Sequence, residues 1–119
     1  MYSPALLDHF QNPRNAGEVD CPDALVEVAN PICGDILRLT ARVREGRIAE
    51  VRFLARGCTA SIAAGSALTG LLWGKTAAEA RLVKRADVEK AIGGLSNESK
   101  HAALLAEDCA RALAAKIAG

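Results

Sequence analysis

The chain has 119 residues, with 15 Lys and Arg against 14 Asp and Glu, so its formal net charge is +1. This length predicts a single domain over residues 1–119, and a hydrophobic content of 50% excludes a disordered chain. The near-zero charge argues against non-specific binding to nucleic acid or to a membrane surface. Because we find neither a leader pattern nor an apolar run of roughly 18 to 20 residues, we expect a cytoplasmic protein.

The first predicted element is a short amphipathic helix over residues 3–11. Ser3 is a good N-cap and Pro4 suits the first helical position. Pro13 ends the helix, because it biases Asn12 away from helical backbone angles. The next predicted element is a short strand over residues 24–29.

A β-hairpin is predicted for residues 35–56, where apolar and polar residues alternate on both sides of Glu45 and Gly46. The apolar positions of both strands are odd-numbered. A three-residue loop, Arg44 to Gly46 with Gly46 left-handed, would bring them onto one face. The resulting pairs are Ala41/Ala49, Leu39/Val51, Leu37/Phe53 and Asp35/Ala55. One further step sets Cys33 opposite Gly57, next to Cys58.

The apolar period becomes helical from residue 59 onward, which predicts helices over 59–73, 76–83, 86–92 and 97–117. Together the elements predict an α+β fold: a three-stranded antiparallel sheet with an N-terminal helix and C-terminal helices packed on one face. Six arginines between residues 38 and 56 then lie on the solvated face of the hairpin. They form either an ordinary polar sheet face or a docking surface for an acidic partner.

The four cysteines, at positions 21, 33, 58 and 109, include no Cys-x-x-Cys pair. A metal site must therefore be assembled from residues distant in sequence. The hairpin predicts that Cys33, Asp35 and Cys58 converge at one end of the sheet. Two thiolates and a carboxylate suit iron or zinc. The alternative is that both cysteines are inert and buried and that Asp35 caps a turn.

Several short motifs occur in order along essentially the whole chain: Tyr2, residues 8–15 with Gly17, residues 31–35, 57–61, 73–76 and 105–108. In this series the chain resembles the IscU family, equivalent to the NifU N-terminal domain. The resemblance implies an IscU/SufE-like α+β fold and a scaffold protein, not an enzyme. Such a scaffold builds a [2Fe-2S] cluster from iron and desulfurase-derived sulfur, then passes it to apo iron–sulfur proteins. Cys33, Asp35 and Cys58 match the first cysteine, the aspartate and the second cysteine of the family site.

The sequence departs from the family where a third cysteine is expected, because Ala102 stands there after His101. We therefore take Cys33, Asp35, Cys58 and His101 as the residues that bind iron or a [2Fe-2S] cluster, with zinc as the alternative metal. Cys109 lies seven residues beyond Ala102, about 10 Å along a helix, and is interpreted as a core cysteine. Cys21 is interpreted as an incidental exposed thiol.

The Leu-Pro-Pro-Val-Lys motif that chaperones recognise in the family is also missing, since residues 94–100 read Gly-Leu-Ser-Asn-Glu-Ser-Lys. This argues against chaperone-assisted release of the cargo. Contacts with a cysteine desulfurase involve the N-terminal segment and the site loops in the family, and these are present. The alternative function is a zinc-binding or desulfurase-binding regulatory module that does not assemble clusters.

Overall fold

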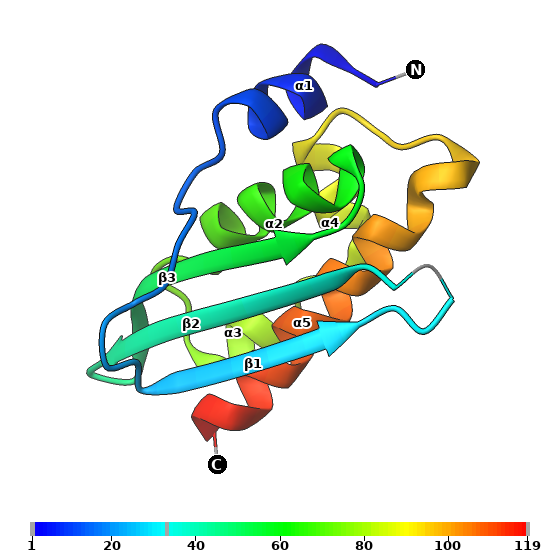
Figure 1. Cartoon of the computed structure of the whole chain (residues 1–119). Coiled ribbons are helices and arrows are strands. Elements are labelled where there is room, and N and C mark those ends of the chain that lie inside the picture. Colours follow the sequence, from blue (N-terminus) through cyan, green and yellow to red (C-terminus); the bar gives the residue numbers. More distant parts are fainter. Residues whose placement is uncertain (1, 33, 119) are drawn as a thin grey trace.

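The computed structural model describes residues 2–32 and 34–118, and its elements follow the predicted order (Figure 1). Ser3 is the N-cap of the first helix, where its hydroxyl accepts a hydrogen bond from the backbone N–H of Leu6 at 3.0 Å, as expected for this residue type. The elements are α1 Pro4–Gln11, β1 Ala24–Ala29, β2 Ile36–Arg44, β3 Arg47–Arg56, α2 Thr59–Leu72, α3 Ala77–Arg81, α4 Arg85–Ala91, the 3₁₀ turn η1 Asn97–Ser99 and α5 Lys100–Ala118.

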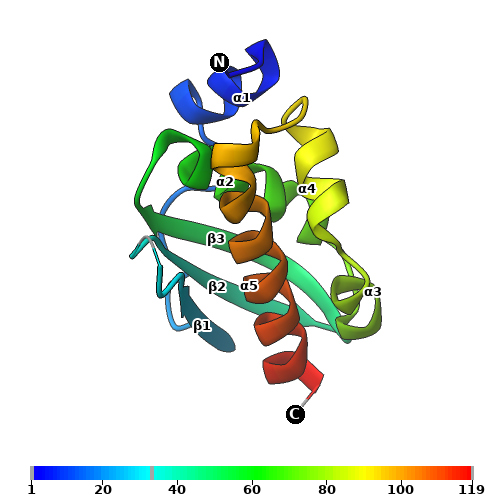
Figure 2. The ribbon, with the colours of Figure 1, turned by 90° about the vertical axis from the view of Figure 1, so that its right-hand side faces the viewer.

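The α+β prediction is confirmed, because the three strands form one antiparallel sheet in the order β1-β2-β3. Helices α2 and α5 pack against one face of this sheet, and α1 packs on α2. Figure 2 shows α5 running across the sheet on that side, with α3 and α4 beside it. Among the described residues, no helix combines the length and apolar character needed to cross a membrane.

The predicted hairpin register is wrong by two residues. Leu39 faces Phe53 and not Val51, and the other pairs shift likewise to Ala41/Val51 and Leu37/Ala55. The turn has two central residues, Glu45 and Gly46, both with positive φ, as in the tight turns that match strand twist.

A bulge next to this turn keeps the odd-numbered residues of the two strands on the same face of the sheet beyond it. Arg42 pairs with Glu50 and Val43 with Ile48, so Ala49 is the extra residue on β3. Ala49 is exposed, whereas Ile48 is buried and takes the core position expected for Ala49. Beyond the bulge, the alternation of apolar and polar residues correctly predicted which side chains face the core. It gave no indication of the bulge itself.

The corrected register changes which residue lies beside Gly57. The last pair of β2 and β3 is Ile36/Arg56, so the next step sets Asp35 level with Gly57. A Cβ atom at Gly57 would in fact stand 2.6 Å from Oδ1 of Asp35. Asp35, and with it the start of β2, is therefore held against the end of β3 directly before Cys58.

Small residues let α2 lie close to the sheet. A Cβ atom at Gly65 would stand 2.6 Å from the Phe53 ring, closer than real side chains approach. Alanines fill much of the rest of this interface. The buried alanines of α2 are Ala60, Ala63, Ala64 and Ala67.

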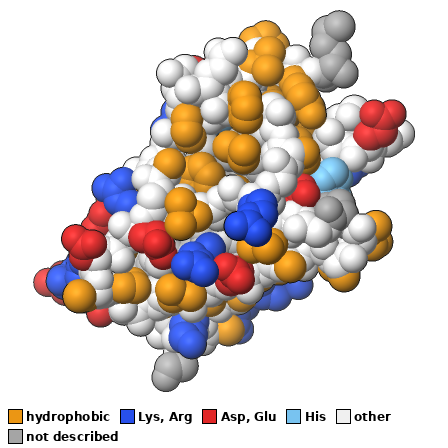
Figure 3. All heavy atoms as spheres, in the orientation of Figure 1, with side chains coloured by type: hydrophobic (Ala, Val, Ile, Leu, Met, Phe, Trp, Pro, Cys, Tyr) orange, Lys and Arg blue, Asp and Glu red, His pale blue; other side chains and the backbone are white. Residues whose placement is uncertain are grey.

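The arginines of the hairpin are mostly paired with acidic side chains. Figure 3 shows basic and acidic side chains interspersed over the sheet face turned away from α5. Such exposed pairs contribute little stability but neutralise the charge. The structure thus favours an ordinary polar sheet face over a docking surface for an acidic partner. The pairs are Arg38 with Glu18 and Glu27, Arg42 and Arg52 with Glu50, Arg44 with Asp23, and Arg47 with Glu79.

Candidate metal centre

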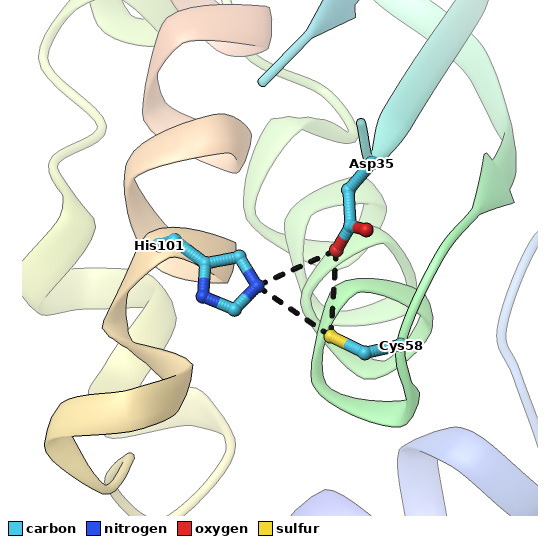
Figure 4. A group of neighbouring side chains, drawn as sticks. All are labelled: Asp35, Cys58 and His101. Atoms are coloured by element: carbon cyan, nitrogen blue, oxygen red, sulfur yellow. Dashed lines mark hydrogen bonds and ion pairs between the residues drawn. The ribbon is translucent and has the colours of Figure 1, made fainter. Parts of the chain in front are cut away.

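Three of the four predicted site residues lie together at one end of the sheet (Figure 4). Asp35 directly precedes β2, Cys58 is the N-cap of α2, and His101 is in the first turn of α5. Their ligand atoms lie within 4.8 Å of one another. The fold therefore brings a thiol, a carboxylate and an imidazole into one group from three separate elements.

The three donor atoms form a nearly equilateral triangle. Sγ of Cys58 lies 3.4 Å from Oδ2 of Asp35 and 3.6 Å from Nε2 of His101, and Nε2 lies 3.4 Å from Oδ2. Around a tetrahedral ion with metal–sulfur bonds of about 2.3 Å and other bonds near 2.0–2.2 Å, donor atoms lie roughly 3.3–3.6 Å apart. The triangle therefore has the dimensions of one face of such a coordination sphere.

The tautomer of His101 follows from its second ring nitrogen. Nδ1 lies 3.0 Å from the backbone carbonyl oxygen of Glu98, and because a carbonyl only accepts hydrogen bonds, Nδ1 carries the proton. In the neutral ring, Nε2 then presents its lone pair to Cys58 and Asp35. A backbone carbonyl that fixes the ring in this way is typical of histidines that bind metals.

Asp35 is the most buried of the three, with 7% of its surface exposed, whereas Cys58 and His101 are half-buried. Its Oδ2 accepts a hydrogen bond of 2.6 Å from the hydroxyl of Ser61 and a longer one from the Cys58 thiol. Its backbone carbonyl accepts from the N–H of Asn30 at 2.8 Å. The carboxylate is thus held by hydrogen bonds, whereas the Cys58 and His101 side chains remain partly accessible to solvent.

Sequence reasoning missed Ser61. The available signal was its spacing, since it follows Cys58 by three residues in a predicted helix and so faces the same way. The hydroxyl also lies 3.4 Å from Sγ of Cys58. Ser61 therefore belongs to the immediate surroundings of the site.

Cys33, the remaining predicted site residue, lies outside the described residues. Ala102, next to His101, is only 1% exposed and offers no donor atom.

Cys109 is fully buried, and its thiol lies 3.5 Å from the backbone carbonyl oxygen of Leu37. Burial raises the pKa of this thiol to about 12. Cys21 is exposed. Neither cysteine belongs to the group of Asp35, Cys58 and His101, and the burial of Cys109 and the exposure of Cys21 agree with the interpretation from the sequence.

A family profile described as the NifU-like N terminal domain matches residues 1–118. The chain belongs to this family. The iron–sulfur cluster assembly scaffold protein IscU 1 of Archaeoglobus fulgidus is 41% identical to this NifU-like chain over 111 residues, which cover 93% of this chain and 72% of that protein. The scaffold protein IscU of Escherichia coli K12 is 37% identical over 115 residues, covering 93% and 89%.

A solved structure supports the same fold. The crystal structure of an iron–sulfur cluster assembly scaffold protein assigned to the SUF system of Fervidobacterium islandicum AW-1 superposes with a TM-score of 0.75. The match covers 95% of this chain and 96% of that one, at 19% sequence identity. The NifU-like chain therefore shares its α+β architecture with that protein, in agreement with the sequence resemblance.

Proposed function

We propose that this chain is an iron–sulfur cluster assembly scaffold or carrier. In this proposal it binds iron or a [2Fe-2S] cluster at Cys33, Asp35, Cys58 and His101 and passes it to apo-proteins. The proposal rests on the convergence of sulfur, oxygen and nitrogen donors at the sheet end in a chain of the NifU-like family. The names of the relatives support a role in assembly and not in catalysis.

Each side chain has a distinct part in such a site. The thiolates of Cys33 and Cys58 supply soft sulfur, which gives affinity for iron. Asp35 supplies a harder oxygen that exchanges more readily, and His101 supplies the neutral Nε2. Because Cys58 and His101 are only half-buried, the cargo can be reached by a recipient protein. The proposed partners are a cysteine desulfurase as sulfur donor and apo iron–sulfur proteins as recipients.

Anaerobic reconstitution with ferric iron and sulfide tests this function. The parent protein should develop the visible absorption of a [2Fe-2S] cluster and transfer it to an apo-ferredoxin. Cys58→Ser should remove the chromophore, because the remaining set is too poor in sulfur. Cys21→Ser is the matched control and should keep it. A parent without a chromophore, or equal chromophores in the parent and Cys58→Ser, would contradict the proposal.

A second candidate, a zinc-binding or desulfurase-binding regulatory module, is favoured by one specific observation. The described donors have the dimensions of a site for a single tetrahedral ion, and the buried Ala102 adds no ligand for a second metal. This candidate predicts retained zinc and no chromophore after reconstitution. The same experiment, combined with zinc analysis, therefore separates the two functions.

A further inference from the structure

We propose that Ser61 is a positioning residue of this site. Its hydroxyl holds the Asp35 carboxylate so that Oδ2 faces both Cys58 and His101. This inference rests on the proposed function, since it assumes that Asp35 binds a metal. It assigns a role to a residue outside the predicted ligand set.

The hydrogen bond between Ser61 and Asp35 is the shortest contact of the group. The Ser61 hydroxyl donates to Oδ2 at 2.6 Å, and Ser61 is only 2% exposed, so water does not compete for this bond. Hydroxyl-to-carboxylate bonds of this length are among the stronger ones in proteins. The oxygen that Ser61 holds is also the one that lies 3.4 Å from Nε2 of His101.

The start of α2 explains why Ser61 can reach Asp35. Cys58 is the N-cap, so Ser61 is the third helical residue, and its backbone N–H donates to the carbonyl of Cys58 at 3.1 Å. The two side chains therefore leave the helix on the same side. Through Ser61, the helix that carries Cys58 also fixes Asp35, the residue directly before β2 and 26 positions earlier in the chain.

Metal binding makes this bond more important. A metal displaces the thiol proton of Cys58, and the thiol's hydrogen bond to Oδ2 is lost with it. Ser61 loses no proton, and it remains as a donor to the carboxylate. Groups that orient a ligating side chain in this way typically contribute about 10- to 100-fold to metal affinity. Ser61 should therefore affect the affinity of the site mainly through Asp35, since its hydroxyl donates its one proton to Oδ2 at 2.6 Å and lies farther, at 3.4 Å, from Sγ of Cys58.

A double-mutant cycle with cobalt(II) as the probe tests this coupling. Co(II) is titrated into the metal-free parent, Ser61→Ala, Asp35→Ala and the double variant, with binding followed by absorbance. Ser61→Ala should weaken binding by about 10-fold in the parent background. In the Asp35→Ala background it should cause no further loss, since the group that it positions is gone.

Ser66→Ala is the matched control, because Ser66 is a buried serine of the same helix whose hydroxyl contacts His9 and Arg14 instead. It should lower the melting temperature and leave Co(II) affinity unchanged. Equal losses from Ser61→Ala in both backgrounds would overturn the proposal, as would the absence of any loss in a parent that binds Co(II). A parent that does not bind Co(II) at all would instead contradict the proposed function.

Discussion

Gly57 leaves room for no side chain beside Asp35. A Cβ atom at position 57 would stand 2.6 Å and 2.8 Å from the two carboxylate oxygens, and Gly57 has a φ of 152°. Both features favour glycine, because a side chain would clash with a fixed carboxylate and strain the backbone. The residue before Cys58 thus determines where Asp35 can lie.

Gly57→Ala should therefore displace Asp35 and weaken Co(II) binding by about 10-fold or more, as expected when a ligand loses its orientation. It should also lower the free energy of unfolding by about 1–3 kcal/mol through backbone strain. Gly17→Ala is the control, since Gly17 has a φ of 121° but a Cβ atom added there would meet no atom within 4 Å. Titration and urea unfolding measure both effects. Equal Co(II) affinities for the two variants would contradict the role of Gly57.

The docking of α1 onto α2 should depend on pH through His9. Burial, followed by the Arg14 guanidinium, lowers the pKa of His9 below its usual value. Its Nδ1 lies 2.8 Å from the Ser66 hydroxyl, which also accepts the backbone N–H of Arg14. Protonation of this partly buried ring would place a second positive charge beside Arg14, which disfavours the charged ring in the folded chain.

Because the folded-state pKa of His9 is lower than the unfolded value of 6.5, the unfolded chain binds more protons between the two values. The free energy of unfolding should then decrease as the pH falls through 6.5. Urea unfolding at pH 7.5 and 5.5 measures this change. His9→Asn keeps an acceptor without a charge and should lose less stability over that range. An identical pH dependence in both proteins would exclude His9 as the cause.

Much of the fold could be predicted because its signals are local. Ser3 and Pro4 specify the start of α1, and the change of apolar period after Cys58 specifies α2. The hairpin register was wrong because a bulged residue, Ala49, has the same alternation as a paired one. The positive φ of Glu45 in the two-residue turn could not be predicted either, since glutamate is uncommon in that conformation.

The site was predictable only in part. Asp35 and Cys58 follow from the hairpin, because β2 begins and β3 ends at the same end of the sheet. His101 lies 43 residues after Cys58, and only the resemblance to the family suggested it. The contact between Ser61 and Asp35 depends on how α2 packs against the sheet, which no residue pattern encodes.

Cys109 should behave as a core residue and not as a ligand. Its raised pKa and full burial predict that it resists alkylation by iodoacetamide in the native protein, whereas Cys21 reacts. Cys109→Ser should lower the free energy of unfolding by about 1–3 kcal/mol, because it buries a hydroxyl among apolar side chains. Peptide mass spectrometry and urea unfolding measure these effects. Rapid native alkylation of Cys109 would contradict the interpretation.

The Glu107 side chain links α5 to the start of α4. This carboxylate is buried, accepts the backbone N–H of Arg85 at the start of α4 at 2.8 Å, and pairs with the side chains of Arg85 and Arg111. Glu107→Ala should lower the free energy of unfolding by about 1.5–3 kcal/mol. Glu107→Gln keeps an acceptor and should cost less. Equal losses in the two variants, measured by urea unfolding, would show that the hydrogen bond is unimportant.

Metal analysis of freshly purified protein measures whether the side chains at the sheet end bind a metal. The parent and Cys21→Ser should contain iron or zinc in similar amounts. Cys33→Ser and Cys58→Ser should each contain much less, because each removes a thiolate from the site. Equal metal content in all four proteins would contradict metal binding by Cys33 and Cys58.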